Sequence, residues 1–222
     1  FSVDIFSPGG SSTGLIRESL GAQRLSYETE EILLYYGMPS PYSQAQEIYL
    51  DLIPKGSYIQ DGIWKIRLIP EEIRDGQYDL WLPAGMALNR ETRFLTASPD
   101  TTLTIPSTAS RAISVGAYDD ATQAYADFSG RGFARLGHPI KPELAAPGVN
   151  IITARAGGGY EAVTGTSFAA PFVTGSAALM MQWGIVNGND PYLYGEKLKA
   201  YLIRGARSLP GEAVYPKTAR PC

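Results

Sequence analysis

The sequence predicts two halves of different fold class: an all-β sandwich of jelly-roll type over residues 1–103, and an α/β arrangement over residues 104–222. In the first half, short runs rich in aromatic and β-branched residues alternate with turns built from Pro, Gly and Asp. In the second half, a short apolar run without strict alternation and two helix-like stretches replace this pattern. The change of pattern near residue 104 predicts the domain boundary.

Length and composition are typical of a soluble globular protein with a sizeable core: 222 residues, 44% hydrophobic and 18% charged. A net charge of −3 and a pI near 5.3 argue against nucleic-acid partners. The one cysteine, Cys222, excludes an internal disulfide framework. The chain starts at Phe1 with neither Met nor a signal-peptide pattern, so we expect a piece of a longer polypeptide whose localisation signals lie elsewhere.

One uncharged stretch, residues 162–189, is long enough to suggest a membrane helix. Gly165, Pro171, Gly175 and Gly184 interrupt it, and no basic cluster flanks it. A helix buried in a soluble α/β core gives the same signal. We therefore predict a buried core helix and no membrane span.

Six runs in the first half have the character of strands. The clearest is residues 62–69, in which Trp64, Ile66 and Leu68 face one way while Lys65 and Arg67 face the other. The other five predicted strands are residues 2–6, 31–36, 47–53, 77–82 and 101–105. Six short strands at this spacing favour a sandwich or jelly roll.

The carboxylates of the first half predict no metal or cofactor site. No pair has metal-ligand spacing, and this half has neither Cys nor His nor a Gly-rich phosphate loop. The adjacent pairs Glu30–Glu31 and Glu71–Glu72 are interpreted as solvated turn residues. This half is expected to be a structural or binding module, and a calcium or carbohydrate site built across its loops stays open.

The second half begins with a strand-like run over residues 112–117, whose lack of alternation is typical of a strand buried on both faces. A glycine loop, residues 157–160, precedes the long uncharged helix. A second helix is predicted from residue 194 to 202, with Leu198, Tyr201 and Leu202 on its apolar side. Its basic residues, Lys197, Lys199 and Arg204, are assigned to the solvent-exposed side of the helix. Residues 209–222 are assigned to a surface segment.

The most informative stretch is residues 164–175, which read TGTSFAAPFVTG. Gly165 permits a sharp turn, and Thr166 or Ser167 can cap a helix. Pro171 is tolerated only in the first turn of a helix. Ser167 is therefore predicted at the mouth of a helix, where free backbone N–H groups and the positive helix end favour a developing oxyanion. The alternative is a capped buried helix without chemistry.

This stretch resembles the serine motif Gly-Thr-Ser-x-Ala-x-Pro-x-Val-x-Gly of the subtilisin-like serine proteases, or subtilases. The resemblance implies that Ser167 is the catalytic nucleophile and that the second half is part of a subtilisin-like parallel-sheet fold. Phe172 replaces a histidine that is usual in the family but is not its catalytic base. The seven fixed positions are Gly165, Thr166, Ser167, Ala169, Pro171, Val173 and Gly175.

Further segments extend the resemblance to residues 104–207. Val-Gly-Ala at 115–117, Phe-Ser-x-Arg-Gly at 128–132 and the run beginning Lys141-Pro142 occur in the order that subtilases show before their serine. The first half resembles the sandwich inserted in bacterial subtilases related to the spore-germination Csp proteases. Its matching segments are WLP at 81–83, TRF at 92–94 and TLTIPSTA at 102–109. The resemblance implies a bacterial source, with secretion or a spore location left open.

A serine nucleophile needs a base, an orienting carboxylate and oxyanion donors. The family's Asp-x-Gly and His-Gly-Thr motifs and its Gly-Asn pair are absent from this sequence. The one histidine, His138, lies in a context that matches no subtilase motif and is interpreted as a loop residue, and Asp127 lacks an Asp motif around it. We therefore expect a piece of a serine endopeptidase that is inactive alone.

Three interpretations are compared. In the first, the chain is the C-terminal part of a subtilase that acts on protein or peptide substrates, with its Asp, His and Asn upstream in the same polypeptide. In the second, it belongs to a pseudoprotease that serves as a regulatory or binding partner. In the third, the sandwich is a plain binding module. Upstream motifs would discriminate the first two, and ligand binding by residues 1–103 would indicate the third.

Overall fold

The structure is a computed structural model, which describes residues 1–39, 41, 45–73, 76–83, 87–89, 91–132, 140–210 and 220–221. The chain forms two compact units, Phe1–Pro83 and Ala84–Cys222. This division lies twenty residues before the predicted boundary at 103/104. Part of the reason is that the backbone N–H groups of Thr101 and Thr102 donate to the carbonyls of Gly132 and Arg131 (3.0 and 2.9 Å), which ties these residues to the second unit.

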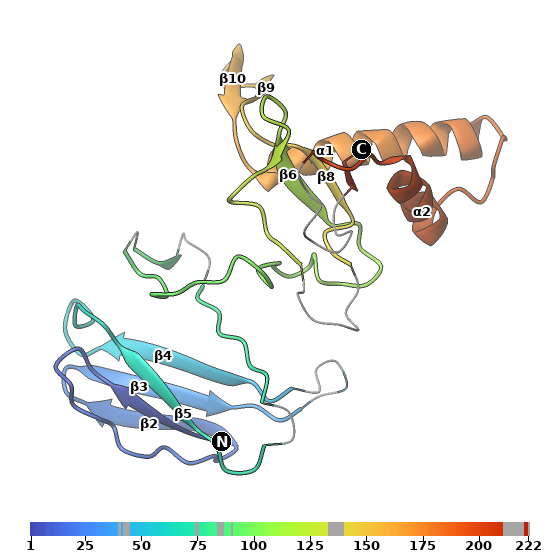
Figure 1. The fold of residues 1–222 in the computed structure, drawn as a ribbon. Coiled ribbons are helices and arrows are strands. Elements are labelled where there is room, and N and C mark those ends of the chain that lie inside the picture. The colour runs from blue at the N-terminus through green and yellow to red at the C-terminus, as the bar shows by residue number, and fades with distance from the viewer. Residues whose placement is uncertain are drawn as a thin grey trace. The chain divides into compact units, whose positions relative to one another are not determined.

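The first unit is built from two antiparallel sheets (Figure 1). Strands β2 (Gly21–Tyr27), β3 (Glu30–Tyr36) and β4 (Ile48–Pro54) form one sheet in sequence order. Strands β1 (Ser2–Phe6) and β5 (Lys65–Ile69) form the other. No α-helix occurs among the residues described in this unit.

The core of the first unit lies between its sheets. Val3 and Ile5 of β1 pack with Ile32 and Leu34 of β3, and all four are at most 2% exposed. Alternation along β3 is complete, because every second residue from Glu30 to Tyr36 is buried. This period of two places one face of each sheet in the core, as the sequence pattern predicts.

Four of the six predicted strands are confirmed, as β1, β3, β4 and the second part of 62–69. The predictions at 77–82 and 101–105 were wrong, because the residues there pair with no described strand. Strand β2 was not predicted because it has no β-branched residue, so only its partly buried alternate positions mark it. These five strands do not establish the jelly-roll topology, which stays a prediction.

The second unit is a mixed α/β arrangement (Figure 1). Strands β6 (Val115–Asp119) and β8 (Leu144–Pro147) pair in parallel, which confirms the buried strand predicted near 112–117. The sheet order is β11-β8-β6-β7, with β7 at Ala124–Tyr125 and β11 at Arg220–Pro221. Of the predicted surface segment 209–222, β11 pairs with β8, Leu209 is buried, and residues 211–219 and 222 lie outside the described part.

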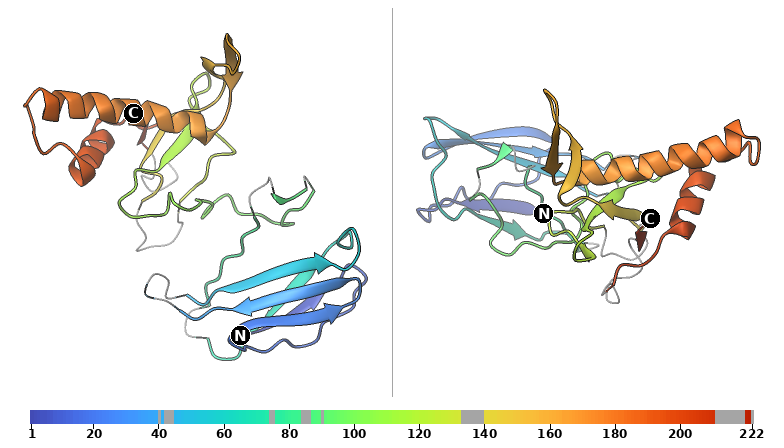
Figure 2. Two further views of the ribbon diagram at one scale, coloured as in Figure 1. Left: turned by 180° about the vertical axis from the view of Figure 1, so that it is seen from behind. Right: turned by 90° about the horizontal axis from the view of Figure 1, so that it is seen from above.

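The uncharged stretch forms helix α1 (Thr166–Met181), which a π-helical turn, η2 (Gln182–Val186), continues. Figure 2 shows the two as one long rod beside α2 (Gly195–Gly205). Helix α1 packs against β6 and β8 through the buried side chains of Ala169 and Val173. Their core partners include Ala117, Leu144, Leu193, Leu198 and Leu202.

The prediction that this helix is buried holds for one side only. Phe172 and Leu179, seven residues or about two turns apart, are 47% and 68% exposed. The helix Thr166–Val186 is long and apolar enough to cross a membrane, but a core helix passes the same test, so this is weak evidence for a span. Its side away from β6 and β8 is an uncovered apolar face.

Candidate functional site

Ser167 is the second residue of α1, and its side chain is exposed. Gly165 stands just before the helix with φ 154° and ψ 159°, a backbone region that is essentially restricted to glycine. Neither Thr166 nor Ser167 caps the helix, contrary to the sequence prediction, because both are already in its first turn and the N-cap residue is Gly165. The serine hydroxyl is therefore free of a capping role.

A second glycine fixes the turn that leads to the serine. Gly148, directly after β8, accepts a hydrogen bond from the N–H of Gly165 (2.8 Å) and donates to the carbonyl of Tyr118 (3.0 Å). A β-carbon at Gly148 would lie 2.6 Å from the Cβ of Ala117 and 3.4 Å from that of Ala169. The close approach of sheet and helix at this glycine places the mouth of α1 at the end of the parallel strands.

Pro171 lies inside α1, in its second turn rather than the predicted first. A proline has no N–H, so the carbonyl of Ser167, four residues earlier, has no helical donor at this position. This explains why a proline is accepted here: it removes one bond near the helix end and leaves the rest of the helix intact.

The electrostatic field at the N-terminus of α1 favours negative charge. No hydrogen-bond acceptor is recorded for the backbone N–H of Ser167 among the described residues. The first turn of α1 contains no acidic side chain, so the positive end of the helix dipole is not neutralised locally. An oxyanion formed next to Ser167 would meet an unpaired N–H donor and the helix end.

No described residue makes a hydrogen bond to the hydroxyl of Ser167. His138, interpreted from the sequence as a loop residue, lies outside the described residues. Asp127 is exposed and has no hydrogen bond to the serine. Within the described part of the chain, the hydroxyl of Ser167 therefore has no base to accept its proton.

A hairpin leads into the site. Strands β9 (Ile151–Ala154) and β10 (Tyr160–Val163) pair in antiparallel fashion, and the predicted glycine loop forms their tip. At the base, the N–H of Asn150 donates to Oγ1 of Thr164 (3.0 Å). This bond and the Gly165–Gly148 bond hold the two ends of the hairpin together beside Ser167.

Sequence reasoning missed a buried charge network at the residues that directly precede β6 and β8. Lys199, assigned to the wet side of its helix, is 9% exposed, and its Nζ lies 2.5 Å from Oε1 of Glu143. Lys141 is fully buried and its Nζ lies 3.0 Å from the same oxygen. Leu198 and Leu202 are buried as predicted, whereas Tyr201 is 46% exposed. The signal that could have marked Lys199 is its position next to Leu198 on the buried side of α2.

The network is satisfied by backbone groups as well as by charge. The N–H of Ser114 donates to Oε2 of Glu143 (2.8 Å), and the Nζ atoms of Lys141 and Lys199 both donate to the carbonyl of Ala112 (2.9 and 3.2 Å). Burial raises the pKa of Glu143, but the hydrogen bonds from Lys199, Ser114 and Lys141 outweigh it and leave the pKa below its usual value. Glu143 is therefore an anion that ties α2 to the sheet.

In the first unit, the interpretation of Glu30 as a solvated turn residue was also wrong. Glu30 is a fully buried strand residue, and its Oε1 accepts from Thr29 Oγ1 and the N–H of Gln60 (both 2.9 Å). The described residues include no group of three or more His, Cys, Asp or Glu that could hold a metal ion.

Comparison with known proteins places this geometry in a family. Residues 89–218 match the Subtilase family, Peptidase S8. Serine protease AprX of Bacillus subtilis is 32% identical, over 52% of this chain and 34% of AprX. A PII-type proteinase of Lactococcus lactis is 45% identical over 61 residues, 27% of this chain and 3% of the proteinase.

Among solved structures, the CspB protease of Clostridium perfringens aligns with a TM-score of 0.85 and 40% identity. The alignment covers 98% of this chain, including the first unit, and 45% of the CspB chain. The chain thus spans about a third of AprX and less than half of the CspB structure.

Proposed function

The chain belongs to the Subtilase family, and on this premise we propose that it carries Ser167 as the nucleophile of a serine endopeptidase that hydrolyses peptide bonds. The observation that carries the proposal is the exposed side chain of Ser167 on the first turn of α1, next to a backbone N–H that donates to no described residue. A serine in this position can reach a carbonyl carbon while the helix end faces the carbonyl oxygen.

The proposed reaction begins when Oγ of Ser167 attacks the scissile carbonyl of a protein or peptide substrate. The proton of the hydroxyl passes to a base, and the tetrahedral oxyanion accepts a hydrogen bond from the N–H of Ser167. The base donates this proton to the leaving amine as the peptide bond breaks. A water molecule that gives a proton to the same base then attacks the acyl group, and the serine oxygen leaves and regains its proton from the base.

The base, its orienting carboxylate and the oxyanion Asn are proposed to come from another part of the same polypeptide. Two observations support this: no described residue bonds to the Ser167 hydroxyl, and the chain spans only 34% of AprX and 45% of the CspB structure. In subtilisin, a protease of the same family, loss of the catalytic base alone lowers the turnover number by a factor on the order of 10⁶. The 222-residue chain is therefore proposed to be inactive by itself.

The domain organisation is part of the same proposal. Residues 104–222 are proposed to be the C-terminal portion of the protease domain, and residues 1–103 a jelly-roll sandwich inserted in it. The likeness to CspB over 98% of the chain supports a common organisation of both units. The uncovered apolar face of α1, with Phe172 and Leu179, is proposed to pack against the remainder of the protease domain.

Labelling with a fluorophosphonate serine-protease probe, read by intact mass, tests the proposal. We would compare the 222-residue chain, its Ser167→Ala variant and the longer natural polypeptide with and without the same substitution. The long form should be labelled, the long Ser167→Ala variant should not, and the 222-residue chain should stay unlabelled. Labelling of the short chain that Ser167→Ala abolishes would contradict its proposed inactivity.

The alternative is a pseudoprotease that keeps the fold and acts as a regulatory or binding partner. The absence of any base bonded to Ser167 among the described residues is the observation in its favour. A long form that binds a protein partner but resists labelling at Ser167 would favour this second function.

A further inference from the structure

Three buried polar atoms of the first unit have no hydrogen-bond partner among the described residues: Oγ of Ser7, the hydroxyl of Tyr27 and Oε2 of Glu30. Ser7 is 3% exposed and Glu30 is fully buried. The ring of Tyr27 lies edge-to-face against Trp64, with the ring centroids 6.5 Å apart. A polar atom that leaves water without gaining a partner destabilises the folded state, so each of these atoms needs an explanation.

The three atoms belong to one end of the core. Tyr27 and Glu30 lie opposite each other in the β2–β3 register, and both face the core. Ser7 directly follows β1. At the other end of β3, the hydroxyl of Tyr36 donates to the carbonyl of Phe1 (3.4 Å). Strands β1 and β3 therefore cross the core in opposite directions, which brings Ser7 to the end that contains Glu30.

The loop between β4 and β5 covers this end of the core. The N–H of Gln60 donates to Oε1 of Glu30 (2.9 Å), which leaves Oε2 as the free oxygen of that carboxylate. The carbonyl of Gln60 accepts from Nε1 of Trp64 (3.0 Å). Since Trp64 also contacts the ring of Tyr27, Gln60 connects the surroundings of Glu30 and Tyr27.

The same loop packs against the turn that follows β1. A β-carbon at Gly9 would lie 3.6 Å from Oγ of Ser7 and 3.9 Å from Nε2 of Gln60, so these two atoms border the same point. A β-carbon at Gly62 would lie only 2.6 Å from the Cβ of Pro8, which shows how closely the loop and the turn approach. Gln60 thus links Ser7 to the other two unpartnered atoms.

We propose that a single ordered water molecule binds at this end of the core and bridges Ser7, Tyr27 and Glu30. A carboxylate oxygen only accepts hydrogen bonds, whereas a hydroxyl both donates and accepts. A water that donates to Oε2 of Glu30 and Oγ of Ser7 and accepts from the hydroxyl of Tyr27 satisfies all three atoms. Buried waters make about three such bonds to groups that would otherwise be unsatisfied. The inference does not depend on the proposed protease activity.

A metal cation fits these atoms less well. The described residues include no group of three or more His, Cys, Asp or Glu that could hold one. A cation would also bind the oxygen lone pairs of Ser7 and Tyr27 and leave their O–H groups without an acceptor among the described residues. Water supplies the missing donors and the missing acceptor together.

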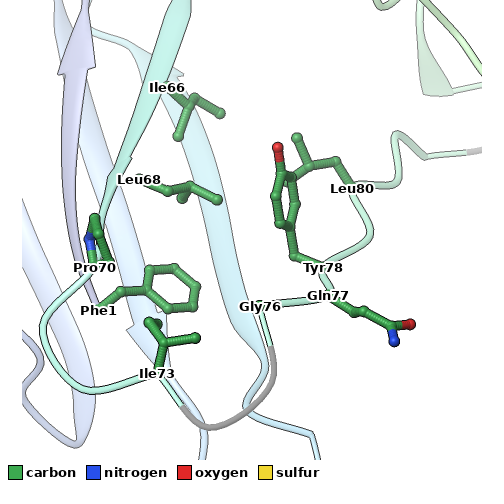
Figure 3. Close-up of a pocket in the computed structure, with 9 residues that line it drawn as sticks. All are labelled: Phe1, Ile66, Leu68, Pro70, Ile73, Gly76, Gln77, Tyr78 and Leu80. Atoms are coloured by element: carbon green, nitrogen blue, oxygen red, sulfur yellow. The ribbon is translucent and has the colours of Figure 1, made fainter.

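The water site is separate from the apolar groove of the first unit. That groove has a volume of about 460 Å³, with Ile66 and Leu68 facing Tyr78 and Leu80 across it (Figure 3). None of the described residues that line the groove belongs to the water site. An apolar cavity can stay dry, whereas a buried place with two to four polar partners can hold a water.

The sign of a stability change tests the proposal in the 222-residue chain. Tyr27→Phe keeps the ring that contacts Trp64 and removes only the hydroxyl, and Ser7→Ala removes only Oγ. If a water bridges these groups, each substitution removes a hydrogen bond and lowers the urea midpoint of unfolding. If the hydroxyls are unpartnered, each substitution removes an unsatisfied buried group and raises the midpoint.

Tyr35→Phe is the matched control, because Tyr35 is 46% exposed on β3 and its hydroxyl can reach bulk water. The midpoint of this variant should equal that of the wild-type chain. A raised or unchanged midpoint for either Tyr27→Phe or Ser7→Ala would overturn the proposal.

A crystal structure that resolves ordered waters gives a direct readout. It should show one solvent peak about 2.5–3.0 Å from Oγ of Ser7, the hydroxyl of Tyr27 and Oε2 of Glu30. The same peak should be absent from the structure of Tyr27→Phe or displaced in it. A peak with several oxygen ligands at about 2.4 Å would indicate a cation, and direct hydrogen bonds among the three side chains would indicate a dry site. Either result would overturn the proposal.

Discussion

The position of Ser167 depends on a backbone conformation at Gly165 that other residues do not adopt without strain. Gly165 has φ 154°, and its N–H is fixed by the carbonyl of Gly148. A side chain at this position would force the turn to change just before the first helical residue. The geometry of the candidate nucleophile is thus determined by two glycines that themselves carry no chemistry.

Gly165→Ala is expected to destabilise the 222-residue chain by about 1–3 kcal/mol, because alanine must adopt a strained conformation there. Chemical denaturation measures the change. Gly175→Ala is the matched control: a β-carbon added there, inside α1, would meet no atom within 4 Å, and the substitution should stabilise by up to about 1 kcal/mol. Equal effects of the two substitutions would show that the turn tolerates a side chain.

At the same scale, the sequence was informative about apolar residues and less so about buried charges. The residue pattern predicted Leu198 and Leu202 correctly, yet Lys199 and Glu30 were both assigned to solvent and are buried. A charged residue is buried only where partners satisfy it, and these partners are distant in sequence. Glu143, the partner of Lys199, lies 56 residues before it (199 − 143), so no local pattern contains the pair.

At the scale of the elements, Glu143 joins β8 to α2, with two ammonium groups sharing one carboxylate. Removal of the carboxylate leaves two buried cations without a counter-charge. Removal of Lys199 leaves a neutral pair between Glu143 and Lys141. The two substitutions therefore differ in consequence although they break the same contact.

Glu143→Gln is expected to cost about 3–5 kcal/mol of unfolding free energy, and Lys199→Met distinctly less. Urea denaturation of the 222-residue chain measures both. Glu196→Gln, an exposed position on α2, is the control and should change stability by no more than about 0.5 kcal/mol. A larger loss for Lys199→Met than for Glu143→Gln would contradict the shared-carboxylate account.

The pH dependence follows from the same group. The folded-state pKa of Glu143 is lowered, so its contribution to stability is fully present above the usual glutamate pKa of about 4.3 and is lost as the pH falls through the folded value. The stability difference between the wild-type chain and Glu143→Gln should therefore shrink as the pH drops below about 4.3. A difference that stays constant to about pH 3 would show that the carboxylate is not the cause.

The same scale explains which elements the sequence could predict. Strand β3 alternates buried and exposed residues and was predicted, whereas β2 lacks β-branched residues and was not. Residues 77–82 have the residue types of a strand but no partner strand in the described part of the chain. Strand formation needs an edge to pair with, and residue type alone does not supply one. Pro171 was expected in a first turn because the start of α1 was not fixed by the sequence.

At the scale of the whole molecule, helix α1 has two apolar sides and only one is covered. Val173 is 3% exposed, whereas Leu179 is 68% exposed. A sequence pattern shows that a helix is apolar on all sides. It does not show which other segments pack against each side, because those segments are distant in the sequence. The sequence therefore predicted the helix and the serine at its mouth, and only the structure separated the covered side from the uncovered one.

Leu179→Lys is expected to change the stability of the 222-residue chain by no more than about 0.5 kcal/mol, because the side chain is largely exposed there. In the longer polypeptide it should cost at least about 2 kcal/mol and reduce fluorophosphonate labelling, because the face is then covered. Denaturation of both forms tests this. Val173→Ala, on the buried side of α1, is the control and should destabilise both forms. An equal change of stability in both forms on Leu179→Lys would show that the face with Leu179 is not buried in the longer polypeptide.

The clamp at the base of the β9–β10 hairpin has a consequence for how the molecule can change over evolution. The Asn150–Thr164 and Gly165–Gly148 hydrogen bonds close the hairpin before the chain enters α1. Residues Gly157, Gly158 and Gly159 at the tip have open space around them. We therefore expect the tip to tolerate insertions and deletions during evolution without a shift of Ser167.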